Sequence, residues 1–133
     1  MSSIIMARSS TLTQVNTDIL KKALEVIALE LGIKVRDYIE DYYGSKHYTW
    51  SGNKIIGSLF TKELTRGIGV TVDKEGKLAF VGNSDGCKED FNKMKDKIEF
   101  TYKVIALVIA AQESGCEVTV TQNNDVTVIE AVQ

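Results

Sequence analysis

The only histidine of the chain lies beside its only tryptophan, in the segment Lys46-His47-Tyr48-Thr49-Trp50. Histidine can act as a general base, and aromatic rings interleaved with lysines can stack a nucleic-acid base or another flat ligand. In a strand, Tyr48 and Trp50 also fall on one face, as a sheet that packs against a helix requires. We favour this packing role. Exposure would instead make the patch a partner-binding surface, because exposed aromatic residues are typical interface hot spots.

Two groups of carboxylates could pair as general acid and base or hold a divalent cation. They are Asp37, Glu40 and Asp41, and Asp85, Glu89 and Asp90. The second group stands at the expected start of a helix, where negative charge complements the helix dipole, so helix capping accounts for it without a metal. The spacing does not fix the distances within the first group.

The two cysteines, Cys87 and Cys116, flank one predicted helix. A continuous helix would hold them roughly 40 Å apart, too far for a disulfide or a shared metal. Near a helix N-terminus the pKa of the Cys87 thiol could be lowered, as a nucleophile requires, but no base accompanies it and we interpret it as a packing residue. We expect no catalytic residue, no metal and no cofactor.

Hydrophobic periodicity predicts two helices that must position these side chains. The first spans residues 18–31, with Asn16 or Thr17 as N-cap and Gly32 at the position where a left-handed residue ends the helix. The second is long and ends at Gly115. Its predicted apolar face consists of Phe91, Met94, Ile98, Tyr102, Ile105 and Ile109.

The remaining segments predict strands. The most specific signal is a hairpin in which residues 69–72 and 78–81 flank Asp73-Lys74-Glu75-Gly76-Lys77, with Gly76 left-handed. Other strands are expected at residues 3–8, after Ile33, at 47–50 and at 54–61, with a last hairpin of 117–121 and 126–131 turning over residues 123–125. The order is β-α-β-β-β-β-α-β-β. The fold class is therefore α+β, with a mostly antiparallel sheet of five or more strands and both helices on one face.

Length and composition are those of one globular domain covering residues 1–133. The chain has a mass of 14.7 kDa, 44% hydrophobic residues and a net charge of -2. The 16 basic residues do not outnumber the 18 acidic residues, which disfavours nucleic acid as a partner. The apolar run 104–111 falls short of the roughly 20 residues that cross a bilayer. The start, MSSIIMARSS, has its arginine after the apolar residues, the wrong order for a secretory signal, so we expect a cytoplasmic protein with no membrane contact.

Three features together resemble a known family: the segment 18–24, the glycine hairpin of residues 67–78, and the long helix that leads to a hairpin at Gly115. This combination is similar to the uncharacterised chloroplast reading-frame 35 family, a domain of unknown function in plastids and cyanobacteria. The resemblance spans nearly the whole chain, and its motifs are structural. It implies an accessory or adaptor role beside a AAA-type ATPase and assigns no catalytic residue.

The leading functional hypothesis is a non-enzymatic protein-interaction or adaptor module that forms homo-oligomers, because exposed strand edges favour assembly. The alternative is a small enzyme or ligand-binding protein with a cleft near His47 and Arg66. A histidine within hydrogen-bond reach of a carboxylate in a concave pocket would favour this alternative. A second alternative is single-strand nucleic-acid binding through Tyr48 and Trp50, which would weaken steeply with salt.

Overall fold

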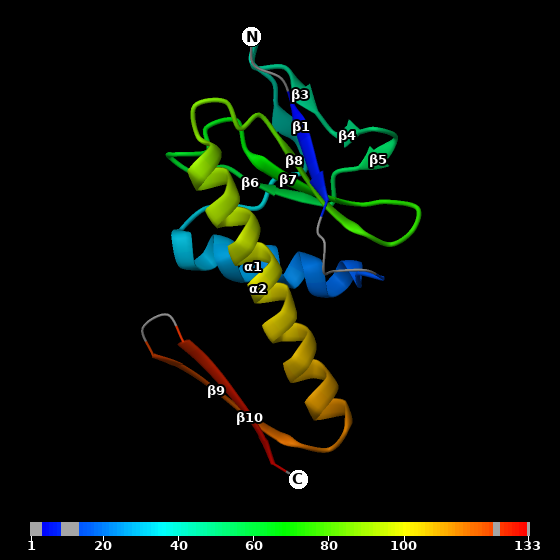
Figure 1. The fold of residues 1–133 in the computed structure, drawn as a ribbon, viewed down its shortest axis with the longest axis vertical. Helices are drawn as coiled ribbons and strands as arrows, with labels where there is room; N and C mark the ends of the chain where they lie inside the picture. The colour runs from blue at the N-terminus through cyan, green and yellow to red at the C-terminus, as the bar shows by residue number, and fades with distance from the viewer. Residues whose placement is uncertain (1–3, 9–13, 124–125, 133) are drawn as a thin grey trace.

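The computed structural model describes residues 4–8, 14–123 and 126–132, and its centre is a four-stranded antiparallel sheet (Figure 1). The strand order is β1-β8-β7-β6. The strands are β1 (Ile5–Arg8), β8 (Leu78–Gly82), β7 (Ile68–Val72) and β6 (Gly57–Leu59). The α+β class and the antiparallel pairing predicted from the sequence are confirmed.

Helix α1 (Thr17–Leu31) begins one residue before the predicted start and ends at the predicted residue. The side chain of Asn16 accepts hydrogen bonds from the backbone N–H groups of Asp18 and Ile19, at 2.9 and 3.2 Å. Gly32 ends the helix with a φ of 68°, a left-handed conformation that glycine adopts without a steric penalty. Because local side-chain chemistry sets both ends, the sequence pattern was sufficient to locate them.

Helix α2 (Lys88–Glu113) is continuous, so Cys87 and Cys116 lie beyond its opposite ends, and both thiols are free. Its start differs from the prediction in one respect. The N-cap is Cys87, which makes no side-chain capping bond, so the carboxylate of Asp85 does not cap the helix. Glu89 and Asp90 do lie in the first turn, where their charge complements the helix dipole.

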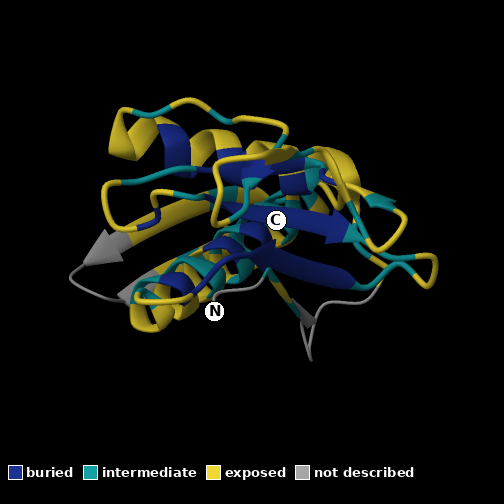
Figure 2. Ribbon diagram, turned by 90° about the horizontal axis from the view of Figure 1, so that it is seen from above, coloured by how far each residue is buried: buried dark blue, intermediate teal, exposed yellow. Residues whose placement is uncertain are grey.

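Both helices pack on one face of the main sheet, as predicted, and together with it they enclose the larger core. In β7 and β8 the alternate residues Ile68, Val70, Leu78 and Phe80 point toward the helices and are fully buried. Figure 2 shows the buried residues gathered in the sheet and on the helix sides that face it. From α2, this core takes the side chains of Phe91, Ile98 and Tyr102.

The opposite face of the main sheet is covered by other segments of the chain. Two short strand pairs lie over this face, and a second core of Ile39, Ile55 and Val81 forms beneath them. The pairs are β2 (Ile39–Glu40) with β3 (Lys46–His47), and β4 (Thr49–Trp50) with β5 (Asn53–Lys54).

The hairpin between β7 and β8 turns at Gly76, as predicted. Gly76 has a φ of 81°, and its N–H donates to the carbonyl of Asp73 at 3.0 Å. The carboxylate of Asp73 also accepts the N–H groups of Glu75 and Lys77, each at 2.9 Å. The N–H of Asp73 also donates to the carbonyl of Lys77 at 3.0 Å, so backbone and side-chain hydrogen bonds together hold the turn.

The last hairpin differs from the expectation of a single sheet with five or more strands. Strands β9 (Glu117–Asn123) and β10 (Val126–Val132) pair only with each other among the described strands. The reason is the length of α2, which continues 11 residues past Tyr102 and carries the chain about 16 Å away from the sheet. The predicted turn at Asn124-Asp125 lies outside the described residues, as do Ser3 and the polar stretch 9–13.

Candidate functional site

His47 lies within hydrogen-bond reach of a carboxylate. Its Nε2 atom is 2.8 Å from Oδ2 of Asp41, and about a third of the imidazole is exposed. The hydrogen bond from His47 is the main reason why the pKa of Asp41 lies below its ordinary value. The carboxylate of Asp41 therefore orients the imidazole ring, as in other histidine–carboxylate pairs.

Asp41 also organises the turn between β2 and β3. Its Oδ1 atom accepts the backbone N–H groups of Tyr43 and Ser45, at 2.9 and 3.0 Å, and its carbonyl accepts the N–H of Gly44 at 3.0 Å. The guanidinium of Arg66 donates to the same carbonyl. The structure thus brings His47 and Arg66 together on Asp41, although Arg66 is 25 positions away in the sequence.

The cluster around Asp41 meets only part of what the enzyme alternative requires. A general base must face a cavity in which a substrate can reach it. The best-formed cavity, of about 470 Å³, is lined by neither His47 nor Arg66. Of Asp37, Glu40 and Asp41, only the last makes an ion pair with His47. The hydrogen bonds that Asp41 makes are those of a residue that holds a turn.

Tyr48 and Trp50 have separate surroundings, so they do not form one platform. The Tyr48 ring is exposed, and its centroid is 5.7 Å from that of Tyr38. Trp50 packs against the second core and edge-on to His47, at 5.7 Å between centroids. Our packing interpretation holds for Trp50 and is wrong for Tyr48.

Two exposed tyrosines at the β2–β3 turn were missed in the sequence analysis. The rings of Tyr42 and Tyr43 meet edge to face at 5.3 Å, and the Arg66 guanidinium lies 5.2 Å from the centroid of Tyr42. The signal for them was Asp41-Tyr42-Tyr43-Gly44, a turn sequence in which the central residues face solvent. They add aromatic surface beside the candidates His47 and Arg66.

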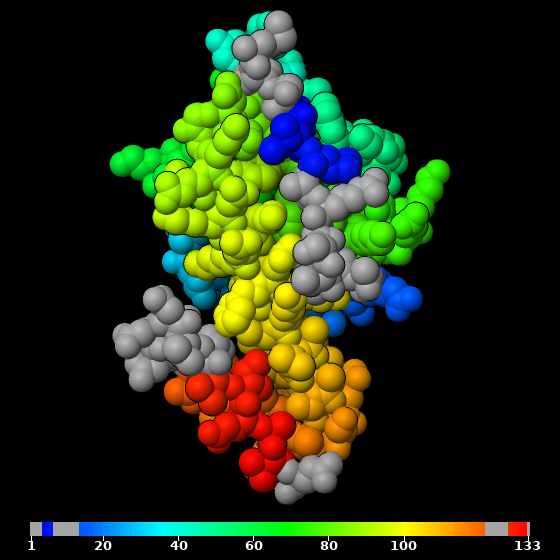
Figure 3. Space-filling model, in the orientation of Figure 1, coloured from blue at the N-terminus to red at the C-terminus, as the bar shows by residue number. Residues whose placement is uncertain are grey.

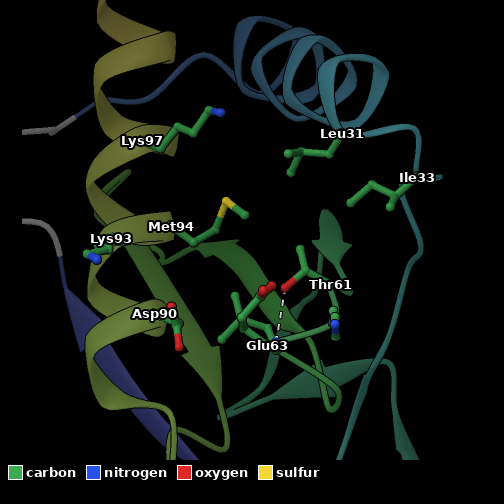
Figure 4. Close-up of a pocket in the computed structure, with 10 residues that line it drawn as sticks. Leu31, Ile33, Thr61, Glu63, Asp90, Lys93, Met94 and Lys97 are labelled. Carbon is green, nitrogen blue, oxygen red and sulfur yellow. Dashed lines mark hydrogen bonds between the residues drawn. The ribbon is translucent and has the colours of Figure 1, made fainter. Parts of the chain in front are cut away.

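The cavity of about 470 Å³ lies between the end of α1, the segment after β6 and the first half of α2 (Figure 4). Leu31, Ile33 and Met94 contribute its apolar wall. Among the charges at its rim, Lys97 pairs with Glu30 and Lys93 with Glu89, both at 3.2 Å. The groove can therefore receive an apolar group, and two of the lysines at its rim already have carboxylate partners. The lining residues are Leu31, Ile33, Thr61, Lys62, Glu63, Leu64, Asp90, Lys93, Met94 and Lys97.

Cys87 has no sign of nucleophilic activation. Burial, and to a smaller extent the nearby Asp90 and Asp85, raise the pKa of its thiol above the ordinary value. A raised pKa reduces the thiolate fraction at neutral pH, the opposite of what a nucleophile requires. Among the described residues no group of three or more His, Cys, Asp or Glu side chains could hold a metal ion.

The far end of α2 is apolar and only partly covered. Residues 104–111 read Val-Ile-Ala-Leu-Val-Ile-Ala-Ala, and none of them is buried. Leu107 is 58% exposed. Figure 3 shows this half of α2 and the β9–β10 hairpin as a protrusion from the body that contains the main sheet. We call residues 104–111 and the hairpin the C-terminal arm.

The hairpin of the C-terminal arm has one apolar face. The pairing places Val120 opposite Ile129 and Val118 opposite Ala131, and directly paired residues point to the same side of a sheet. Val118 and Ile129 are half-buried, so this face rests on α2, while Val120 and Ala131 remain exposed. Helix α2 therefore covers only part of the apolar face.

Comparison with protein-family models found no match, and neither did comparison with curated proteins or with solved structures. In the described part of the chain, no helix is long and apolar enough to span a membrane.

Proposed function

We propose that this protein is a non-enzymatic protein-interaction module that self-associates through its C-terminal arm and works in the cytoplasm. The observation that carries the proposal is the apolar run of residues 104–111, eight consecutive helical positions of which none is buried. A helix that is apolar on every side is normally enclosed by protein. In one copy of the chain, Ile105 and Ala106 pack against the margin of the larger core and the hairpin contacts α2 from one side, while Leu107 and Ala110 remain exposed.

The energetic argument is that exposed apolar surface is costly to leave in water. Burial of a leucine side chain is worth about 1.5–3 kcal/mol. Monomeric proteins seldom keep contiguous apolar patches of more than a few hundred Å² unless a partner uses them. The exposed members of the arm include Leu107 and Val120, and also Val128 and Val132 on the opposite face of the hairpin. A partner that covers Leu107 and Val120 would gain such a contribution from each.

The family resemblance adds a candidate for the larger assembly, a AAA-type ATPase that the self-associated module would serve as an accessory subunit. The Tyr42–Tyr43 turn offers a second exposed aromatic surface for such a protein. It lies on the segment that covers the far face of the main sheet, remote in the fold from the arm.

The test is the mass of the purified chain in solution, measured by light scattering over a hundredfold range of concentration. We expect a dimer or higher oligomer for the natural chain and a monomer for Leu107→Glu, because the variant places charge in the buried interface. The matched control is Leu29→Glu on α1, at a position that is 84% exposed and outside the arm. A natural chain that stays monomeric, and is recovered from its host without companions, would contradict the proposal.

A ligand-binding or catalytic role near His47 is the second candidate, favoured by the convergence of His47 and Arg66 on Asp41. It predicts that a small anionic ligand shifts the ring resonances of His47 in a nuclear magnetic resonance titration. The His47→Gln variant should lose affinity for the same ligand. Unchanged His47 resonances across a panel of small carboxylates and phosphates would reject this role.

A further inference from the structure

We propose that the partner of the C-terminal arm is a second copy of the chain, and that the two hairpins join through β9 into one four-stranded antiparallel sheet. This inference rests on the proposed function, because it specifies how the arm self-associates. The order of the joined strands would be β10-β9 in one protomer, followed by β9-β10 in its partner. A twofold axis would pass between the two β9 strands, at Val120.

The first argument is that the hairpin has open edges. β9 and β10 pair only with each other among the described strands, so the outer side of each carries backbone N–H and C=O groups without a strand neighbour. A sheet of two strands is marginally stable alone, and a third and fourth strand satisfy more of these groups. By contrast, the outer side of β6 in the main sheet is occupied, since Ser58 and Arg36 exchange two backbone hydrogen bonds.

The second argument is that little protects the β9 edge from pairing. Natural proteins block exposed edges with proline, charged side chains such as lysine, or bulges. The strands Glu117–Asn123 and Val126–Val132 contain no proline and no lysine, and the seven pairs between them run in unbroken register. The only charged residue of β9 is Glu117, at its start, so most of this edge carries none of these devices.

The third argument is symmetry, which favours a second copy over a different strand. A twofold axis generates antiparallel pairing of a strand with itself. When the two β9 strands pair with Val120 on the axis, Thr119 lies opposite Thr121 of the partner subunit. Threonine pairs of this kind stabilise sheets. The two Glu117 positions would lie about 20 Å apart, so their charges would repel only weakly.

The competing edge, β10, is less suited to pairing with itself. If two β10 strands paired with their middle residue, Ile129, on the axis, Glu130 of one protomer would be a diagonal neighbour of Glu130 of the partner subunit. Diagonal neighbours lie about 7–8 Å apart, and like charges at that distance oppose pairing. The β9 edge therefore has the better self-complementarity of the two.

The joined sheet would also cover the apolar helix. With the twofold axis perpendicular to the sheet, the apolar faces of both hairpins lie on the same side, and so do both α2 helices that rest on them. Val118, Val120 and Ile129 of one protomer would then continue the apolar face of the other. The exposed Leu107 side chains lie on these helices, where the partner's helix can bury them.

The test is a disulfide placed at the axis. In a Cys87→Ser/Cys116→Ser background, Val120→Cys should form a disulfide-linked dimer under mild oxidation, because paired Cα atoms across antiparallel strands lie about 4.5–5.5 Å apart. The matched control is Val128→Cys on β10, since Val128 and Val120 are equally exposed, at 44% and 47%. The two Val128 positions would be about 14 Å apart or more across the joined sheet and should not link.

Three results would overturn the inference, and they separate it from the proposed function. A disulfide at position 128 but not at position 120 would show that the arm self-associates through another strand edge. A disulfide at neither position, in a chain of dimeric mass, would show that it self-associates through the helix alone or in another register. A monomeric natural chain that still binds a different protein through Leu107 would show that the arm docks a heterologous partner. Linkage at position 120 alone, in a chain of dimeric mass, is the expected result.

Discussion

Tyr102 is the last buried residue of α2, and its hydroxyl ties this helix to the start of α1. The side chain is 8% exposed, and its oxygen accepts the backbone N–H of Asn16 at 2.9 Å. The substitution Tyr102→Phe removes this acceptor and leaves the packing of the ring in place. A hydrogen bond of this kind contributes about 0.5–1.5 kcal/mol, and an unsatisfied buried donor costs more. Because Asn16 is exposed, water can reach the released N–H, so we expect a loss of about 1 kcal/mol.

Urea unfolding and thermal unfolding would measure this loss. For a domain of 133 residues, 1 kcal/mol corresponds to a fall in Tm of about 3–4 °C. The control is Tyr43→Phe, at a ring that is 86% exposed, and it should change stability by less than about 0.5 kcal/mol. An unchanged Tyr102→Phe would mean that the hydroxyl does not hold Asn16. A loss above about 3 kcal/mol would mean that the ring itself moves. Either result would refute the conclusion that this hydrogen bond holds α2 to the start of α1.

Two further predictions concern the Asp41 turn and the main sheet. The pKa of Asp41 is lowered in the folded protein, mainly by His47, so the carboxylate stabilises the fold above its ordinary pKa of 3.8 and loses this effect as the pH falls below that value. Asp41→Asn should therefore be less stable than the natural chain at pH 5–7, and the difference in urea midpoint should shrink at pH 3; a constant difference would contradict this linkage. Gly82→Ala should lower the free energy of unfolding by about 1–3 kcal/mol, because the added Cβ would lie 2.7 Å from the Gly67 carbonyl oxygen and 2.8 Å from the Phe91 ring. Unchanged stability of Gly82→Ala would show that β8 can shift without loss of packing.

Features of the fold that depend on local chemistry could be predicted from the sequence. The Asn16 cap, Gly32 and the Gly76 turn each involve residues within a few positions of one another. The separation of the last hairpin from the main sheet could not be predicted this way. The apolar spacing of α2 continues from Tyr102 through Ile105 to Ile109 without interruption, yet Tyr102 is the last of these residues to be buried. Helical periodicity shows which face is apolar and does not show what covers it.

The candidate site, too, could be predicted only in part from the sequence. His47 was identified because it is unique in the chain, and Asp41 because carboxylates cluster near it. Their pairing, and the approach of Arg66 from 25 positions away, depend on how β2 and β3 lie against the loop before β7. Trp50 turns toward the second core while Tyr48 faces solvent, because the strands here are two residues long and do not sustain an alternating pattern.

These observations assign different tasks to the two parts of the chain. From β1 to Tyr102, the helices cover one face of the main sheet and β2–β5 cover the other, and only Ile105 and Ala106 of the arm add to the margin of the larger core. The apolar residues of the C-terminal arm are not fully covered, since its part of α2 lacks a buried residue and its hairpin has open edges among the described strands. Burial of exposed apolar side chains such as Leu107 and Val120 is favourable, so the most economical account of the arm is that another protein surface covers it.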